Sequence, residues 1–599
     1  MVSFSSHGEP KSALPLRSLS NHSSSFAPGS LVLDDDDEPK PSAWRNFVDS
    51  FRRDPNGHVS KPGQMGVDGK LFDLEGAAAN TASSPLQRKL KCRHLQMIAI
   101  GGSIGTGLFV NSGKSLAMGG PASLLMAFTL IGVMLYSTVQ ALGEMAVVFP
   151  VAGSFSAFST RFLDPAWGFA MGWNYALQWL ITLPLEIVAA SVTVSYWPSN
   201  ISPAAWVTIF YVLIVMINLF GVRTYGEAEF VFSIIKVIAV IGFIILGIVL
   251  NIGGGPGGTY IGGRYWRDPG AFNHGFKGLC SCFVNAAFAF TGTELVGLAA
   301  AEAANPRKAL PTAVKQVFWR ITLFYIVALT LVGLLVPYTD PRLLRPDNQA
   351  DAKASPFVIA IKNAGIEGLD SVMNVVIMIA ILSVGNSSIY GSSRTLAALA
   401  EQHQAPRFLA YIDRRGRPLF AIGIASLLGL LGFLAASSRQ QEVFTWMIAI
   451  SSLSSIFTWG SICLAHIRFR RGWAVQGHTL DELAFTSQPG VIGSWVGLIF
   501  NILVLVAQFW VGIAPIILNE GSNPSLARAK NWFSVYLTGP IVILFYVPYK
   551  LWFKTKIVRA RNMDLKTGRR DLDIAHLIAE ERAERAGWPV WKNVFHFFC

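Results

Sequence analysis

Charged residues and cysteines are scarce in this chain. Charged side chains make up 14% of the 599 residues, whereas 52% of the residues are hydrophobic and the mean hydropathy is +0.43. Soluble domains carry about 25% charged residues, so the composition excludes an ordinary soluble domain and indicates an integral membrane protein. Five cysteines provide neither a disulfide framework nor a metal-ligand pattern.

Several motifs that are typical of enzymes are also missing. The chain contains no GxxxxGK[ST] phosphate loop, no HExxH zinc motif and no GxSxG nucleophile elbow. The glycines between Gly101 and Gly107 follow no predicted strand, as a dinucleotide fingerprint would require. We therefore predict no catalytic residue, no cofactor and no metal site. The formal net charge of +13 lies mostly at the ends of apolar segments, which is typical of membrane topology and not of a nucleic-acid-binding surface.

Polar tails flank the apolar part of the chain. No apolar h-region precedes residue 90, so no cleavable signal peptide is predicted. The polar composition predicts a disordered cytosolic tail over residues 1–90. A transmembrane domain over residues 91–556 and a cytosolic C-terminal tail over residues 557–599 follow.

Hydropathy predicts an all-α polytopic protein with about twelve transmembrane helices. The predicted limits are 95–114, 122–148, 166–196, 204–222, 229–252, 279–303, 316–336, 372–400, 419–437, 443–466, 490–517 and 532–553. Basic residues precede the first span and recur in the even-numbered loops, where we count Arg88, Lys89, Lys91, Arg93, Arg307, Lys308, Lys315, Arg320, Arg407, Arg414, Arg415, Arg417, Arg468, Arg470 and Arg471. The positive-inside rule then places both termini in the cytosol.

The sixth span is interrupted at its centre. Residues 283–302 are apolar and long enough to cross a bilayer, yet Thr291-Gly292-Thr293-Glu294 divides them. A carboxylate at mid-membrane costs on the order of 2.5–3.5 kcal/mol, so such a residue normally faces a polar cavity. The pattern predicts a broken helix whose freed backbone groups line a site. The alternative is a continuous helix with one satisfied acid.

The first span has a similar interruption, between Gly101 and Gly107. Its Gly105-Thr106-Gly107-Leu108 corresponds to Gly292-Thr293-Glu294-Leu295 in the sixth span. Two glycine-interrupted apolar segments at matching places in two halves indicate a transporter built from inverted repeats.

Ionisable residues within the predicted spans are the first candidates for function. They are Glu144, Glu186, Lys236, Glu294 and Glu302. Glu294 lies at the sixth-span break and is the best single candidate for substrate contact, whereas Glu144 and Glu302 lie near cytosolic span ends and suit structural or gating roles. Further gating or pocket candidates in the eighth and tenth spans, where helix packing is the alternative explanation, are Asn386, Ser387, Tyr390 and Trp446.

Lys236 suggests how transport is driven. In two-repeat transporters a sodium ion is held by the unwound first span and by hydroxyls of the eighth. A fixed ammonium there would repel sodium and could donate hydrogen bonds to the freed carbonyls. We therefore predict proton coupling, with Glu294 or Glu186 changing protonation. The alternative is a lysine that extends to the cytosolic face.

Several long motifs resemble those of a known family. Residues 100–109 resemble the first-span signature of the amino acid–polyamine–organocation superfamily, and residues 290–297 with 302–308 resemble the sixth-span signature of fungal amino-acid permeases. Residues 315–325, 355–361 and 382–387 are similar to those of the fungal general amino-acid permeases of the yeast amino acid transporter family. The aromatic-aromatic-Cys ending is also similar. The resemblance covers residues 85–599.

The resemblance implies a plasma-membrane proton–amino acid symporter of broad L-amino acid specificity that works by alternating access. It implies a LeuT-like five-plus-five inverted repeat with two discontinuous helices and two extra helices. The substrate carboxylate is expected at the first break and the amino group at the sixth. These substrate-binding residues are Ser103, Ile104, Gly105, Thr106 and Gly107, with Phe290, Thr291, Gly292, Thr293 and Glu294.

The resemblance also implies regulation through the tails. Ubiquitin ligase machinery is expected to modify N-tail lysines and so direct endosomal and vacuolar trafficking; the candidates are Lys11, Lys40, Lys61 and Lys70. Cys599 is expected to be acylated beside the membrane lipid, as a palmitate-type lipoprotein. Two alternatives stay open: a narrower permease for proline, basic or aromatic amino acids, and a nutrient receptor with a signalling role.

Overall fold

The structure, a computed structural model, describes residues 45, 48–55, 72–102, 104–198, 200–344, 355–436, 440–516, 524–569 and 587–589. The chain divides into Met1–Asp49 and Ser50–Cys599, and all that follows concerns the second unit. The regular structure of its described residues is helical, apart from isolated bridges that join Arg53 to Asp413 and Leu90 to Ala303. The predicted all-α class is confirmed.

The helices follow the predicted spans in order. The spans are built from α3 (Cys92–Gly101), η1 (Gly107–Asn111), α4 (Ser112–Val148), α6 (Pro165–Val194), α7 (Pro203–Leu219), α8 (Val222–Asn251), α9 (Gly275–Phe290), α10 (Leu295–Leu298), η3 (Ala299–Glu302), α11 (Pro306–Arg320), η4 (Ile321–Val327), α12 (Ala328–Leu335), α15 (Leu369–Glu401), α16 (Leu419–Gly429), η8 (Leu430–Ala436), α17 (Gln440–Val475), α18 (Gly490–Ile513), α19 (Pro524–Tyr536) and α20 (Thr538–Phe553). Shorter helices outside them are α2 (Leu74–Ala82), α5 (Phe155–Phe162), η2 (Trp266–Gly270), α13 (Pro341–Leu344), α14 (Pro356–Asn363), η7 (Arg407–Ala410), η9 (Leu480–Glu482) and η10 (Ala560–Asn562).

Length and apolarity identify eight helices in the described chain that could cross a membrane alone, or up to nine if the bent pair α19 and α20 is one span. The fourth and ninth predicted spans are shorter apolar helices, Pro203–Leu219 and Leu419–Leu434. One long helical stretch, Gly107–Val148, contains the end of the first span and the whole second span. Within the described chain, nine spans, two shorter helices and one further span inside Gly107–Val148 together make the twelve predicted spans.

A sharp turn separates the first two spans. Within α4, Gly120 has φ 77° and ψ 172°, and Pro121 follows it. Positive φ suits glycine, and proline has no N–H to continue the hydrogen-bond ladder. The first span therefore continues to Gly119, whereas its hydropathy predicts an end at residue 114.

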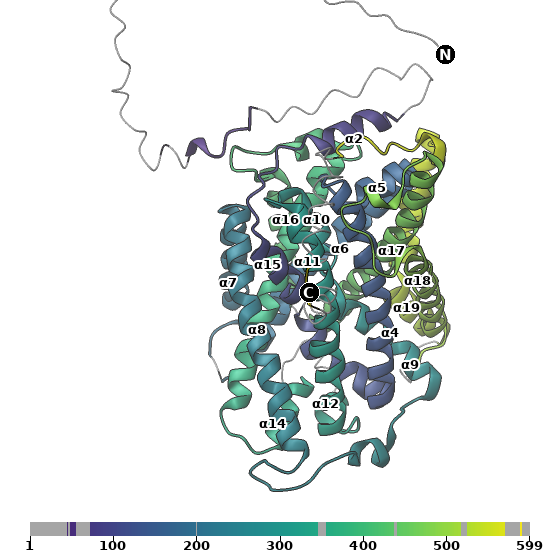
Figure 1. The fold of residues 1–599 in the computed structure, drawn as a ribbon. Coiled ribbons are helices and arrows are strands. Elements are labelled where there is room, and N and C mark those ends of the chain that lie inside the picture. Colours follow the sequence, from purple (N-terminus) through teal and green to yellow (C-terminus); the bar gives the residue numbers. More distant parts are fainter. Residues whose placement is uncertain are drawn as a thin grey trace, which may run out of the picture. The chain divides into compact units, whose positions relative to one another are not determined.

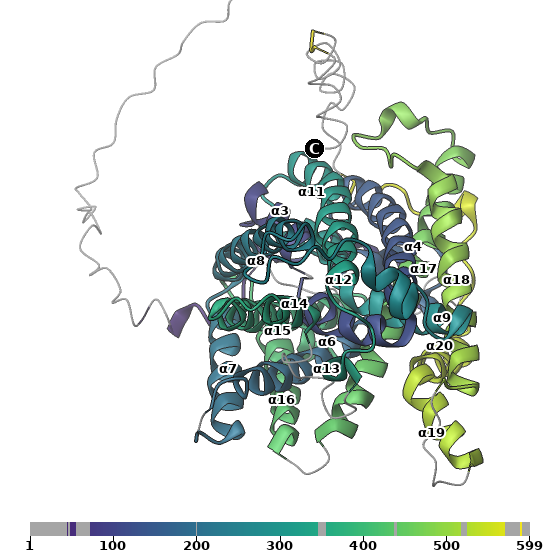
Figure 2. The same ribbon diagram turned by 90° about the horizontal axis from the view of Figure 1, so that it is seen from below.

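The helices differ strongly in burial. In the most apolar stretch of α6, 83% of residues are buried, against 28% in α18, so α6 is central and α18 lies at the periphery of the bundle. Long helix α15 packs along α6. Figures 1 and 2 both show α18 and α19 at one flank of the bundle and α7 and α8 at the opposite flank.

Segments from both predicted tails pack at one end of the bundle. Helix α2 lies within the predicted disordered tail, and Figure 1 shows it beside α5. The Ala152 N–H donates to Thr81 O at 3.0 Å, and Arg161 Nη2 donates to Asp564 Oδ2 at 2.7 Å. The prediction of disorder therefore does not hold for residues 74–82. The other tail limits stay predictions.

Candidate functional site

Both predicted interruptions are present. Helix α3 ends at Gly101, and η1 begins only at Gly107. Helix α9 ends at Phe290, where Thr291 turns to an extended backbone with φ −55° and ψ 138°. Gly292 then adopts φ 99°, a conformation that suits only glycine well. The prediction of two discontinuous helices is confirmed, and the alternative of a continuous sixth helix is wrong.

The two breaks lie in direct contact. A Cβ placed on Gly107 would lie 2.3 Å from the Cα of Ala289, and one on Gly105 would lie 2.4 Å from Val384 Cγ2. Real Cβ atoms do not approach backbone atoms so closely. Glycine at these positions therefore allows the first break to pack against the end of α9 and against α15.

A hollow opens beside this contact. Its free volume is about 10 Å³, which is about what one water molecule needs. The hollow is therefore nearly closed in this conformation. Its lining comes from both breaks and from α6, α9 and α15: Gly105, Thr106, Gly107, Trp179, Thr182, Glu186, Phe288, Thr291 and Val384.

Glu186 is the acid in this lining. Thr106 Oγ1 donates a hydrogen bond to Glu186 Oε2, which links the first break to α6. The other carboxylate oxygen, Oε1, is buried and has no hydrogen-bond partner among the described residues, and neither has Trp179 Nε1. Buried polar atoms are nearly always paired, so these two atoms are each available for one further hydrogen bond.

Glu294 is buried beside the hollow and does not line it. Tyr175 OH donates to its Oε1 at 3.1 Å, and Trp459 Nε1 donates to its Oε2 at 3.1 Å. Its carboxylate also accepts from the Gly292 N–H at 3.2 Å. The acid therefore stabilises the turn of its own break and attaches that turn to α6 and α17.

The neighbours of Glu294 point in different directions. Thr291 lines the hollow and its Oγ1 lies 2.7 Å from Ser455 Oγ. Phe290 packs in an aromatic cluster, with its ring centroid 4.1 Å from Tyr325 and 6.0 Å from Phe128. The residue that reaches the hollow is Phe288, which sequence reasoning missed together with Trp179 and Thr182.

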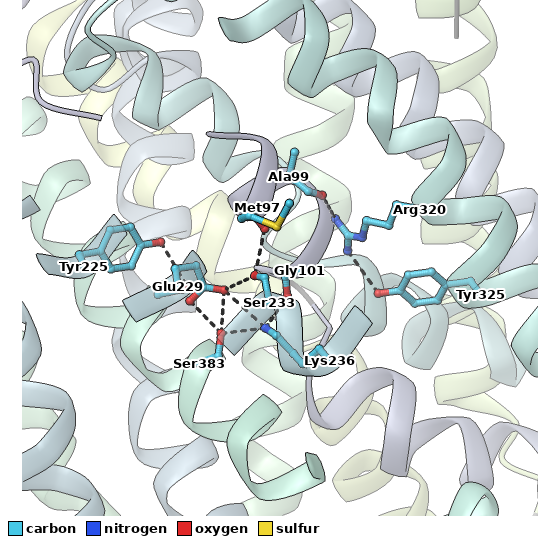
Figure 3. Close-up of polar contacts among 11 residues, drawn as sticks. Met97, Ala99, Gly101, Tyr225, Glu229, Ser233, Lys236, Arg320, Tyr325 and Ser383 are labelled. Carbon is cyan, nitrogen blue, oxygen red and sulfur yellow. Dashed lines mark hydrogen bonds and ion pairs between the residues drawn. The ribbon is translucent and has the colours of Figure 1, made fainter. Parts of the chain in front are cut away.

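Lys236 lies where the sequence predicts, next to the first break. Its Nζ donates to Gly101 O at 2.5 Å and to Ser383 Oγ at 2.8 Å, and it lies 3.4 Å from Glu229 Oε1 (Figure 3). Because Lys236 is 0% exposed, the alternative of a lysine that extends to the cytosolic face is wrong. The ammonium joins α8 to the end of α3 and to α15.

Glu229 is a site residue that sequence reasoning missed. It is fully buried and accepts from Ser383 Oγ at 2.7 and 2.8 Å. The predicted fifth span began at residue 229, which placed this acid at the membrane surface, whereas α8 begins at Val222. The signal was available, because Glu229, Ser233 and Lys236 share one helical face at i, i+4 and i+7.

Arg320 contradicts its sequence assignment. It was counted among the basic residues of a cytosolic loop, yet it is 1% exposed and ends α11 inside the bundle. Its Nη1 donates to Ala99 O and to Thr293 Oγ1, each at 2.8 Å (Figure 3 shows the Ala99 bond). One side chain thus contacts both broken spans.

Glu302 and Glu144 form separate buried clusters. Glu302 accepts from Tyr390 OH at 2.7 Å and from Arg394 Nε at 3.1 Å, which joins the end of the sixth span to α15. Glu144 accepts from Arg470 Nη2 at 2.8 Å, and its Oε1 lies 3.0 Å from His466 Nε2. Neither acid lines the hollow, in keeping with structural or gating roles.

The remaining candidates lie around this frame. Asn386 Oδ1 accepts from Asn218 Nδ2 at 2.8 Å, and Ser387 Oγ lies 3.2 Å from Tyr225 OH. Trp446 is half-buried at the start of α17 and does not line the hollow. Ile104 is buried at the first break.

Some predicted sites lie outside the described residues: Ser103, Lys11, Lys40, Lys61, Lys70 and Cys599. Within the described ranges no group of three His, Cys, Asp or Glu side chains converges in a way that could hold a metal ion.

Comparison with known proteins identifies the family. The family model described as amino acid permease matches residues 94–562. The general amino-acid permease GAP2 of Candida albicans is 58% identical over 594 residues, which cover 98% of this chain and 99% of that protein. The general amino-acid permease GAP1 of Saccharomyces cerevisiae is 53% identical, with 94% and 93% covered, and the histidine permease of the same yeast is 49% identical, with 86% of each chain covered. A transporter with two interrupted spans around a polar hollow, this chain belongs to the amino acid permease family.

Proposed function

We propose that this chain is a plasma-membrane symporter that carries a broad range of L-amino acids together with protons by alternating access. Two similar full-length relatives are named general amino-acid permeases, which supports the substrate class. The observation that carries the proton coupling is Lys236, whose ammonium bridges the first break and the eighth-span hydroxyl of Ser383. This contact supports proton coupling, because a fixed ammonium beside the freed carbonyls of a broken span would repel a coupling sodium ion.

We propose the hollow as the substrate site. The N-terminal end of η1 at Gly107 offers backbone N–H groups and a positive helix end to the substrate carboxylate. The orphan Oε1 of Glu186 and the sixth break at Thr291 then receive the ammonium. These contacts recognise groups that all amino acids share, while Phe288 and Trp179 surround the variable side chain. Glu294 acts behind the site, as the support of the sixth break.

The proton step acts on the end of α3. As an ammonium, Lys236 donates to Gly101 O, to Ser383 and toward Glu229, and so holds the cytosolic half of the first span against α8 and α15. A neutral amine has one donor fewer and no charge, so its hold on the helix end is weaker. Proton release is therefore expected to loosen α3 and open the hollow to the other side. Glu186 is a second group that could carry the coupled proton, because it lines the hollow.

Uptake of labelled amino acids at two external pH values tests the proton coupling. In permease-deficient cells, the parent chain is expected to accumulate substrate faster at pH 5 than at pH 7, with or without sodium. Lys236→Gln is expected to reach the membrane, lose accumulation by at least 10-fold and lose its dependence on external pH. Lys308→Gln, at an exposed lysine of α11, is the matched control and should behave as the parent. Uptake that requires sodium and ignores pH would contradict the proposal.

A competition panel tests the range of substrates. Relatives of about 49% identity include a histidine permease and a protein named S-adenosylmethionine permease, so identity at this level does not set the range. We expect neutral, basic and acidic L-amino acids to inhibit uptake of one labelled substrate. Inhibition by a single class, such as proline or the basic amino acids, would establish the narrower alternative.

We also propose that the tails regulate the permease at the plasma membrane, with both termini in the cytosol. Acylation of Cys599 is expected to be lost in Cys599→Ala, measured by thioester-specific labelling. Ubiquitination after addition of a rich nitrogen source is expected to depend on Lys11, Lys40, Lys61 or Lys70, and Lys→Arg variants of each identify which. If the Cys599→Ala variant still takes up the thioester-specific label, the expectation of acylation at Cys599 is wrong.

A further inference from the structure

Arg320 is a buried cation that the proton step does not use. It is the last residue of α11, directly before the π-helical turn η4 (Ile321–Val327). Such π turns are rare and occur often at functional sites, because the extra residue redirects the side chains around it. Here Arg320 reaches away from its own span, toward Ala99 at the end of α3 and Thr293 in the sixth break.

The charge of Arg320 is compensated differently from that of Lys236. Lys236 has Glu229 as its carboxylate partner, whereas the described residues offer no ion pair to Arg320. Its acceptors are neutral oxygens: Ala99 O, Thr293 Oγ1 and, at 3.2 Å, Tyr325 OH. A buried charge that has no ionic partner is strongly unfavourable unless other groups compensate it.

Two helix ends supply the missing compensation. Ala99 belongs to the last turn of α3, and Tyr325 OH donates at 2.7 Å to Ala289 O in the last turn of α9. The C-terminal end of a helix carries roughly half a negative elementary charge, so the α3 end compensates part of the guanidinium charge directly. The α9 end contributes through the Tyr325 hydroxyl.

We propose that Arg320 is a positioning residue that ties the two broken spans together, so that they move as one body during transport. A guanidinium stays protonated at every accessible pH, so this link persists throughout the transport cycle. The contact of Lys236 with Gly101, in contrast, weakens when Lys236 loses its proton. The end of α3 can then leave α8 and α15 but stays attached to the sixth break, which keeps both halves of the hollow in register.

The test uses variants that remove the link in different ways. Arg320→Gln removes the charge, Arg320→Lys keeps the charge on a shorter side chain that lacks the Nη1 and Nη2 donors, and Thr293→Val removes only the acceptor in the sixth break. Tyr325→Phe removes the hydroxyl between Arg320 and the α9 end but leaves the bonds to Ala99 and Thr293 in place, so it measures the charge compensation apart from the link. Each tagged variant is expressed in permease-deficient cells, and membrane arrival, maximal uptake, KM and the pH profile of uptake are measured.

We expect Arg320→Gln and Arg320→Lys to lower maximal uptake at least 10-fold, with KM changed less than 3-fold and the shape of the pH profile unchanged. Thr293→Val should lower maximal uptake about 5-fold, and Tyr325→Phe less than 3-fold. Combining Thr293→Val with Arg320→Lys should add nothing to the loss caused by Arg320→Lys, because both remove the same link.

Three results would overturn the proposal. Full transport by Arg320→Lys would show that only the charge matters, and losses that multiply in the double variant would show that Thr293 and Arg320 act independently. A changed pH profile in Arg320→Gln would make Arg320 part of the proton step. If Arg320→Gln fails to reach the membrane, the Arg320→Lys and Thr293→Val series decides. The parent's own pH dependence tests proton coupling separately, so the two proposals can fail independently.

Discussion

The two breaks differ in what holds them. The first break contains glycines and no acid, and the carbonyls at its helix end are capped by Lys236 and Arg320, which come from α8 and α11. The sixth break carries its own acid, since Glu294 accepts from Gly292 in the same turn and from Tyr175 and Trp459. The first break is thus held by side chains from other helices, of which only Lys236 can release it, whereas the sixth is stabilised from within. We therefore expect the end of α3 to leave α8 and α15 while it stays attached to the sixth break.

The largest effect is expected from a methyl group placed between the two breaks. In Gly107→Ala the new Cβ would lie 2.3 Å from the Ala289 Cα, and a backbone atom cannot move aside as a side chain can. Overpacking of this kind costs about 1–3 kcal/mol, and it separates the breaks. We expect uptake to fall about 100-fold, at the upper end of that range. The control is Gly242→Ala in α8, where nothing lies within 4 Å of the new Cβ, and unchanged uptake by Gly107→Ala would refute the contact.

The next effect tests the anchoring of the sixth break. Glu294→Gln keeps the size of the side chain but directs an N–H₂ group toward Tyr175, Trp459 or Gly292, all of which are donors in the structure. Losing hydrogen bonds to a charged group costs about 1.5–3 kcal/mol, which corresponds to a loss of uptake of roughly 10- to 100-fold. Membrane arrival is measured beside uptake. Trp459→Phe removes one donor only and should lose less, so equal losses would argue against this account.

A smaller effect is expected at the first break. Thr106→Val is nearly isosteric and removes the hydroxyl that donates to Glu186, whose carboxylate then loses that partner. We expect KM for amino acids to rise about 5- to 10-fold, because the orientation of Glu186 in the hollow is no longer set. Thr106→Ser restores the hydroxyl and should restore KM. If Thr106→Val and Thr106→Ser behave alike, the hydroxyl has no role.

The smallest effect lies outside the membrane, where the C-terminal segment docks on α5. Burial alone would raise the pKa of Asp564, but Arg161 and the N–H groups of Thr567 and Lys566 lower it below its ordinary value. A depressed pKa means that the carboxylate stabilises docking at neutral pH and loses this effect as the pH falls through the folded-state value. Asp564→Asn is expected to weaken docking by about 1.5 kcal/mol at pH 7. Limited proteolysis of residues 554–569 measures this, and the difference from the parent should shrink on acidification.

The sequence predicts the fold and the breaks well, because glycine, threonine and one acid inside apolar spans can be recognised from the sequence alone. It fails where a side chain's direction depends on the tertiary structure. Phe290 was expected to contact the ligand, but its ring packs against Tyr325 and Phe288 lines the hollow, because residues two apart on a helix point in nearly opposite directions. Arg320 was counted with a cytosolic loop because it follows Arg307, Lys308 and Lys315, although the predicted span 316–336 already contained it. The partners of Glu294 come from α6 and α17 and leave no local signal.

The bend between α19 and α20 leaves two short helices at that flank. The two helices meet at 65° and contain 13 and 16 residues. At 1.5 Å per residue they rise roughly 20 and 24 Å, so neither alone matches a hydrocarbon layer of about 30 Å. We expect the bilayer to be locally thinner along this edge. Lipids with short acyl chains should therefore gather there, which gives the permease a preferred neighbourhood within the membrane.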